Sequence, residues 1–324
     1  MTLVLSAGNA ASPASRAELC PLPPVYVEDD INRPPTESAY PGLARESAVS
    51  LTSDSHVELA RFEPQNGIPI GPIQNTKAHI GGYVKLDAIH DFDAIGKTDQ
   101  FDVGSIPTDG RPGENSRLHA RQTRLNLDTR FLGGTRDLRV FVEGDFFNQD
   151  DTSFRLRHAF AEVGGFTVGQ TWTTFMDEGP GPRIVDFENP SGYIIDRRAL
   201  LRYEYQFRDT WILSLGIEES GITISEPAGT TGTTNSLWPD SIARIRWEHS
   251  HFHLQTAAVI REFQFQADLT NETQDVTGWG FNFSGRAEVT GRDTSYFEIT
   301  FGEGIGGFRG VPDAGPDALG VLEA

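Results

Sequence analysis

The sequence predicts an all-β fold in the form of a transmembrane antiparallel β-barrel, and three observations carry this prediction. The chain of 324 residues has 34 Gly, 19 Pro and only 2 Met, with 10% aromatic residues, a composition that favours strands and turns over packed helices. Apolar and polar residues alternate through most of the chain from residue 77 onward. Many alternating stretches reach about nine residues, the length that crosses a bilayer at a tilt.

The first 76 residues differ from the rest of the chain. They are rich in Pro, Ser, Ala and acidic residues and hold no sustained hydrophobic period, so we expect a disordered or extended leader over residues 1–76. The N-terminus has no basic region and an apolar run of only Leu3, Val4 and Leu5. No signal peptide is therefore visible in this sequence. Because no run approaches the ~18 apolar residues of a membrane helix, membrane residence would require a barrel.

The alternating stretches then follow one another. In AHIGGYVKLDAIHDF, Ile80, Gly82 and Val84 share one side, and Tyr83 and Lys85 share the other. The stretches QTRLNLDTRF and LRVFVEGDFF, joined by the turn GGTRD, predict a hairpin. The alternation continues through FRLRHAF, GFTVGQTW, ALLRYEYQF, TWILSLGIE, SIARIRWEH, HFHLQTAAVIREF, GWGFNFSGRAE and SYFEITFGE. We expect about eleven strands over residues 77–310 and a polar tail or loop over residues 311–324.

The two sides of these strands indicate which medium each side meets. In ALLRYEYQF, Leu201, Tyr203 and Tyr205 oppose Arg202 and Glu204. A soluble β-sandwich would bury the apolar side, and nothing in such a fold requires repeated Arg on the solvent side. Aromatic residues at both rims around a polar lumen are typical of a lipid-facing barrel. The pattern favours an outer-membrane barrel, with a soluble all-β carbohydrate-binding protein or hydrolase as the alternative.

Net charge and tryptophans add two expectations about partners. The formal net charge is −19, from 46 acidic and 27 basic residues, which argues against a nucleic-acid partner because no excess positive field meets phosphates. Tryptophans on the apolar sides are candidates for contacts with lipid at the membrane interface or with another subunit. These are Trp172, Trp211, Trp247 and Trp279.

Four stretches carry a resemblance to a known family: RLHARQTRLNLDTR, FVEGDFF, FRLRHAFAEVGGFTVGQTWTTFMD and FGEGIGGF. Here the sequence, from about Ile80 to Gly307, resembles the DcaP-like porins of Gram-negative outer membranes. The resemblance implies a sixteen-stranded homotrimeric porin for small, mainly anionic solutes such as aromatic or aliphatic dicarboxylates. Family members usually have a signal peptide and an N-terminal helical segment and end with further strands. We therefore expect this chain, with about eleven strands, to be an incomplete, truncated member, and a non-functional porin fragment is a third possibility.

The polar side predicts which residues line the pore. Rings of Arg favour anions, because guanidinium stays charged at every relevant pH and offers a planar fork to a carboxylate. The acids on the same side, among them Asp128 and Glu204, would face these Arg across the pore. The alternative is that the Arg pair with acids only to stiffen the wall. By parity the pore-lining residues are Arg124, Arg130, Arg139, Arg155, Arg157, Arg198, Arg202, Arg244, Arg246, Arg286, Glu143 and Asp145.

Other motifs give weaker indications of chemistry. Glu143 and Asp145 share one side as the carboxylates of a glycosidase do, but on neighbouring lumen positions we expect wall charges. His251 and His253 could ligate a metal with a third group, although solvated imidazoles at a hairpin end are the favoured interpretation. We therefore expect a channel rather than an enzyme, with no catalytic residue, metal or cofactor.

Overall fold

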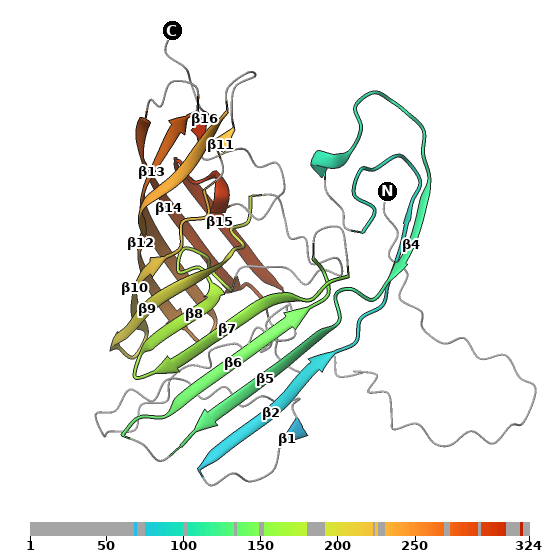
Figure 1. Ribbon diagram of the computed structural model, residues 1–324. Helices are drawn as coiled ribbons and strands as arrows, with labels where there is room; N and C mark the ends of the chain where they lie inside the picture. The colour runs from blue at the N-terminus through green and yellow to red at the C-terminus, as the bar shows by residue number, and fades with distance from the viewer. Residues whose placement is uncertain are drawn as a thin grey trace, which may run out of the picture.

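A computed structural model of the chain consists almost entirely of β-strands (Figure 1). The described residues are 68–69, 75–99, 103–132, 135–148, 152–179, 192–222, 224–225, 231–268, 273–290, 293–308 and 318–319. The leader expected over residues 1–76 and the tail expected over residues 311–324 lie almost wholly outside these ranges. In the described parts of the chain, no helix is both long and apolar enough to cross a membrane.

One antiparallel sheet of twelve strands dominates the fold and runs as a strongly curved wall (Figure 1). Apart from the two-residue β1, it contains eleven strands of at least seven residues, in agreement with the expected number. Along the sheet these strands are β1 (Ile68–Pro69), β2 (Thr76–Tyr83), β5 (Arg124–Phe131), β6 (Leu138–Asp145), β7 (Arg155–Val163), β8 (Phe166–Trp172), β9 (Arg197–Arg208), β10 (Trp211–Glu218), β12 (Gly232–His249), β13 (Phe252–Ala267), β14 (Thr273–Glu288) and β15 (Thr294–Glu303). Within the described residues β1 and β15 form the two edges of the sheet and do not pair with each other.

The predicted hairpin is confirmed, with Arg124 opposite Asp145 and Phe131 opposite Leu138 on β5 and β6. Connections at one end of the sheet are short. Between β7 and β8, Gly164 and Gly165 both have positive φ, 56° and 88°, as a two-residue hairpin turn requires. The connections at the other end are long, with residues 173–196 between β8 and β9. This asymmetry is typical of outer-membrane barrels.

The side-chain alternation places apolar residues on the outer side of the curved sheet. Leu201, Tyr205 and Leu215 are 46%, 50% and 51% exposed, whereas Arg202 and Ser214 on the same strands are 5% and 1% exposed. A water-soluble sheet would show the reverse arrangement. The inside of this fold is therefore polar and its outside apolar, as a barrel in lipid requires.

A hydrophobic cluster also fills part of the concave side, and its members come from the connections as well as the wall. Phe175 and Met176 after β8, Ile194 before β9 and Phe308 in η2 (Gly306–Phe308) are fully buried. They pack against inward residues of β12 and β13, namely Ile242, Ala257 and Val259, in a cluster that also includes Trp172, Tyr193 and Ile305. The described parts of the connection from β8 to β9, residues 173–179 and 192–196, therefore fold into the concave side of the sheet.

The expectation that Trp172 contacts lipid or another subunit is wrong, because its side chain is 3% exposed and belongs to this internal cluster. Trp279 does lie on the outer side and is 39% exposed. Trp211 and Trp247 form a cross-strand stacked pair with ring centroids 5.6 Å apart. Aromatic pairs on the outer side are compatible with a membrane-interface belt.

Two small two-stranded sheets are separate from the large sheet in the described residues. The hairpin of β3 (Asp87–Asp91) and β4 (Asn115–His119) extends away from the large sheet, with η1 (Val103–Ser105) in its connection (Figure 1). The parallel pair of β11 (Ile224–Ser225) and β16 (Ala318–Leu319) lies near the long-connection end of β12 and β13.

Candidate functional site

All ten predicted arginines and both predicted acids lie on the polar side and are buried or half-buried. Each of the ten arginines also has a carboxylate oxygen within 4.0 Å. The acids expected to face the arginines across the pore instead pair with arginines on nearby strands: Asp128 with Arg139 on the adjacent strand, and Glu204 with Arg244 two strands away. That expectation is wrong, since the local pairs place charges of both signs on the same patch of wall.

The first group of paired charges, which we call the arginine cluster, joins β5, β6 and β7. Its members are Arg124, Glu143, Asp145, Arg155 and Arg157. Arg155 donates two hydrogen bonds to Asp145, 2.9 Å from Nε to Oδ1 and 2.7 Å from Nη2 to Oδ2. Arg157 bridges both acids, 3.1 Å to Glu143 and 3.0 Å to Asp145, and Arg124 lies 3.6 Å from Glu143. Three guanidinium groups thus surround two carboxylates.

A bulge brings these arginines together. Asp145 pairs with Arg155 and Gly144 with Leu156, but Glu143 pairs with His158, so Arg157 is an extra residue on β7. After the bulge the parity of β7 reverses, and His158 becomes buried at 5% exposure. Strict alternation puts Arg155 and Arg157 on one side of the strand and His158 on the other. The burial of His158 departs from this pattern because the sequence does not mark an inserted residue in a strand.

A second group of charges lies on β9, β10 and β12. Arg244 donates to Glu204 and, at 3.2 Å from Nε, to Ser214, while Arg202 lies 3.7 Å from Glu204. Arg246 reaches Glu248 at 2.7 Å. These side chains lie on three successive strands of the sheet, and Arg246 also lies close to the inward-folded connection.

The inward-folded connection is held to the wall by polar contacts. The Asp177 carboxylate accepts hydrogen bonds from His253 Nε2 at 3.0 Å and Ser284 Oγ at 2.7 Å, and Arg246 Nη1 lies 3.5 Å away. Burial would raise the pKa of Asp177, but the His253 hydrogen bond and the Arg246 charge outweigh burial and hold this pKa well below its usual range. The carboxylate therefore stays charged and keeps the connection fixed.

Further contacts tie the two ends of this connection to the sheet. Glu218 accepts hydrogen bonds from Thr173 Oγ1 at 2.5 Å and from the Thr174 backbone N–H at 2.6 Å. Gln255 donates to the Met176 carbonyl at 3.0 Å, and the Ile194 N–H donates to Glu298 at 3.1 Å. Such a connection narrows the space on the concave side.

The charges of the second group act on the next residue, Glu178. Burial raises the pKa of Glu178 above its usual value, and Glu204 raises it further, although the charges of Arg202, Arg244 and Arg246 oppose this shift. Its carboxyl therefore gains a proton at a higher pH than an ordinary glutamate does.

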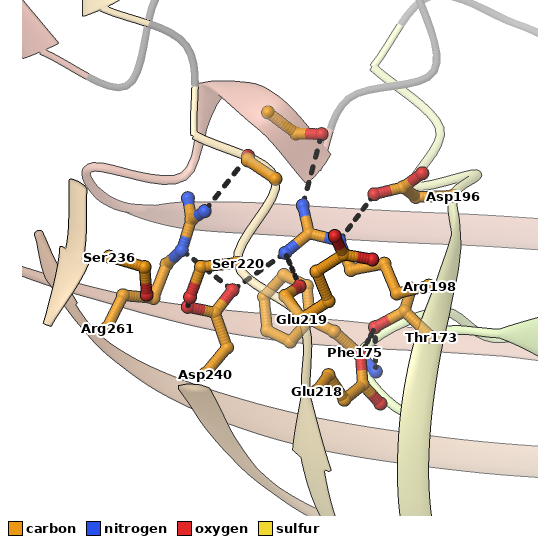
Figure 2. Close-up of polar contacts among 12 residues, drawn as sticks. Thr173, Phe175, Asp196, Arg198, Glu218, Glu219, Ser220, Ser236, Asp240 and Arg261 are labelled. Carbon is orange, nitrogen blue, oxygen red and sulfur yellow. Dashed lines mark hydrogen bonds and ion pairs between the residues drawn. The ribbon is translucent and has the colours of Figure 1, made fainter. Parts of the chain in front are cut away.

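A buried ion network anchors η2 to the wall (Figure 2). Asp240 accepts from Arg198 Nη1 at 2.7 Å and from Arg261 Nε at 2.9 Å. Arg261 also donates to the Gly304 carbonyl at 2.6 Å, and both guanidinium groups lie against the Phe308 ring, 3.8 Å from it for Arg198 and 4.9 Å for Arg261. Sequence reasoning missed Arg261, although it shares the parity of the buried Val259 and Phe263 on β13.

The remaining predicted arginines, Arg130, Arg139 and Arg286, also lie in ion pairs. Arg139 contacts Asp128 at 3.1 Å and Glu162 at 3.0 Å. His251 and His253 have different partners: His251 is exposed beside Glu288, while His253 is buried against Asp177, so the favoured interpretation as solvated imidazoles holds only for His251. In the part of the chain that the structure describes, no three His, Cys, Asp or Glu side chains form a metal-binding group.

Comparison with known proteins connects this architecture to one family. Residues 54–305 match the family model described as DcaP outer membrane protein. The crystal structure of the outer membrane channel DcaP of Acinetobacter baumannii matches with a TM-score of 0.62 and 24% identity, covering 71% of this chain and 65% of that chain. This chain therefore spans 65% of the length of that channel.

Two further solved structures match more weakly. An anion-selective porin from Comamonas acidovorans matches with a TM-score of 0.37 and 12% identity, over 70% of this chain and 79% of that one. OmpT, an outer membrane protein of Vibrio cholerae, matches with a TM-score of 0.36 and 11% identity, over 72% of this chain and 78% of that one. No curated protein matches the chain.

Proposed function

The chain belongs to the DcaP family of outer membrane proteins, and on that premise we propose that it forms a porin through which small, mainly anionic solutes diffuse passively. Dicarboxylates, aromatic or aliphatic, are the solute class we assign to it. The family and fold are those of an outer-membrane channel rather than of an enzyme, and the proposal requires no cofactor and no catalytic residue.

The observation that carries this proposal is the inverted distribution of side chains across the sheet. Exposed apolar residues such as Leu201 and Leu215 cover the outer side, while Arg202, Arg244 and other charged residues lie inside. Burying apolar surface against acyl chains stabilises such a wall, and a polar interior gives water and ions a path. A soluble carbohydrate-binding protein or hydrolase would have to leave this apolar outer side in water.

The preference for anions rests on the local charge of the wall rather than on the net charge of −19. The arginine cluster has three guanidinium groups for two carboxylates, an excess of one positive charge. Guanidinium groups in ion pairs keep N–H donors that can point toward a passing carboxylate. The same arginine side chains can therefore both stabilise the barrel wall through ion pairs and bind passing anions.

The proposed assembly is a homotrimer in the outer-membrane lipid, with residues 77–310 as the barrel wall, residues 1–76 as a leader and residues 311–324 as a tail or loop. The connection between β8 and β9, fixed by Asp177 and Glu218, would narrow each pore and bring solutes close to the arginines. The predicted pore-lining residues would act along this narrowed path.

Planar-bilayer conductance tests the proposal. The 324-residue chain is inserted into a bilayer that separates two KCl concentrations, and the reversal potential is measured. We expect channels whose reversal potential indicates a preference for chloride over potassium, and a reduced current when succinate is added. Failure to form channels, or a preference for potassium, would contradict the proposal.

A further inference from the structure

Arg197, at the start of β9, differs from the arginines that sequence reasoning assigned to the pore. Its side chain is half-buried and lies against Trp172, a member of the internal hydrophobic cluster. Each of the ten predicted arginines has a carboxylate within 4.0 Å, whereas among the described residues no carboxylate or other acceptor binds the Arg197 guanidinium. Its nitrogen atoms are also not sealed from solvent. Arg197 therefore offers unused N–H donors to the interior.

The Arg197 guanidinium is held in place by an aromatic ring rather than by an acid. It lies 4.6 Å from the ring centroid of Trp172, its cross-strand partner on β8. Trp172 itself is packed edge to face against His158, with centroids 5.1 Å apart, and belongs to the internal hydrophobic cluster. Stacking on a fixed ring orders the guanidinium without using any of its five N–H donors.

The charges around Arg197 favour an anion strongly. The charges of Arg157, Arg155 and Arg124 act on its guanidinium, and the charge of Asp145 acts on it with the opposite sign. Together, Arg197 and the three arginines of the arginine cluster carry four positive charges against the two carboxylates of Glu143 and Asp145, an excess of two. A dicarboxylate carries the two negative charges that balance this excess, whereas a monocarboxylate balances half of it.

We propose that Arg197, positioned by Trp172, is a binding site for one carboxylate of a small dicarboxylate solute, whose second carboxylate is balanced by the arginine cluster. The guanidinium donates two parallel hydrogen bonds to the first carboxylate, as its planar geometry allows. This inference rests on the proposed porin function and adds to it a specific residue, a stoichiometry and a preference for two charges over one.

The test measures binding directly. The 324-residue chain, refolded in detergent at low ionic strength, is titrated calorimetrically with succinate and with butyrate, which has the same number of carbon atoms but one carboxylate. We expect succinate to bind more tightly than butyrate. The substitution Arg197→Gln should weaken succinate binding about tenfold, as the loss of a charged hydrogen-bonding group does. Arg208→Gln, at the exposed end of the same strand, is the matched control and should bind as the unchanged chain does.

A second variant separates charge from geometry. Arg197→Lys keeps the positive charge but loses the planar guanidinium that donates two parallel hydrogen bonds. We therefore expect succinate binding to weaken severalfold while remaining tighter than in Arg197→Gln. Both substitutions should leave the fold intact, because the Arg197 guanidinium has no ionic partner among the described residues. Circular dichroism in the same detergent checks this. Equal succinate affinity in the unchanged chain and in Arg197→Gln, or absence of succinate binding to the unchanged chain, overturns the inference.

The titration and the bilayer measurement fail independently of each other. Binding in detergent does not require ion conduction, so a chain that binds succinate through Arg197 but prefers potassium in the bilayer contradicts the porin's anion preference alone. A chloride-preferring channel whose succinate affinity is unaffected by Arg197→Gln contradicts the Arg197 site alone.

Discussion

The Asp177 carboxylate accepts a hydrogen bond from Nε2 of His253 at 3.0 Å, although 76 positions separate the two residues in the sequence. This contact joins the connection after β8 to the inner side of β13. Both side chains are buried, at 0% and 5% exposure, so the interaction is shielded from water. The width of the space on the concave side therefore depends on the connection after β8, which this contact holds in place, as well as on the strands of the wall.

Removing the Asp177 charge is expected to release this connection. In Asp177→Asn, the negative charge next to His253 and Arg246 is lost and an NH2 group replaces one of the two acceptor oxygens, so we expect a loss of about 1–3 kcal/mol in the free energy of unfolding together with a larger single-channel conductance. Thermal unfolding in detergent and planar-bilayer recordings measure the two effects. Asp137→Asn, in the exposed turn between β5 and β6, serves as the control. Unchanged conductance in Asp177→Asn would show that the connection does not narrow the pore.

The pH dependence of ion preference is expected to follow Glu178. The pKa of this residue is raised by burial, so the folded state favours the protonated, neutral carboxyl, which forms as the pH falls through the raised pKa, above the usual range for glutamate. Protonation leaves Arg202, Arg244 and Arg246 less compensated. Chloride preference should therefore increase as the pH is lowered from neutral toward the usual titration range of glutamate.

Two variants test the assignment of this pH dependence. Reversal potentials of Glu178→Gln should no longer change over that range and should match those of the unchanged chain at low pH. Glu114→Gln, an exposed glutamate in the connection before β4, should retain the dependence. A pH dependence that persists in Glu178→Gln would assign it to another group.

The arginine cluster is expected to stabilise the wall as well as to guide anions. Arg157→Met removes the guanidinium that bridges Glu143 and Asp145, and it leaves both buried carboxylates with weaker compensation. We expect a loss of about 3 kcal/mol in the free energy of unfolding, measured by urea denaturation in vesicles. Arg208→Met, which removes an exposed arginine, should change stability by less than about 0.5 kcal/mol. Equal effects of the two substitutions would contradict a structural role for the cluster.

The outer side of the sheet is expected to lie in lipid. Leu215→Arg, in the middle of β10 and on the exposed side, should destabilise the barrel in lipid vesicles by about 2–4 kcal/mol, the cost of a charge near the bilayer centre. The same substitution at Val289, in the turn between β14 and β15, should cost about 1 kcal/mol or less. If Leu215→Arg does not lower the stability of the barrel in vesicles, the outer side of the sheet faces water.

The alternation of apolar and charged residues determines much of this fold at the level of the sequence. Period-two patterns identify the strands, and the repeated Arg opposite Leu and Tyr, as in β9, indicates which side faces lipid. These inferences succeed because successive side chains in a strand point to opposite sides, a property of the local backbone. In the structure the twelve predicted pore-lining side chains are buried or half-buried, and their role in lining a pore stays a prediction.

Alternation fails where the two sides of a strand have similar chemistry or where the strand is irregular. On β13 the buried, inward side contains the apolar Val259 and Phe263 as well as Arg261. Because this side is mostly apolar, the alternation does not identify it as the inward side. On β7 the bulge at Arg157 reverses the pattern for His158. The parity of Trp172 suggests an outward ring, but the end of β8 turns it inward.

The sequence by itself determined the strands, the polar side and the family resemblance, because each depends on residues close together in the chain. The tertiary structure decided which charges meet: the Asp177–His253 contact, the Arg198–Asp240–Arg261 network and the stacked Arg197 beside Trp172 all join distinct elements of the fold. The physical reason is that ion pairing and stacking require atoms within a few ångströms. Such proximity depends on sheet curvature, register and the path of the connections. The two-residue alternation of apolar and polar residues along a strand does not determine any of these.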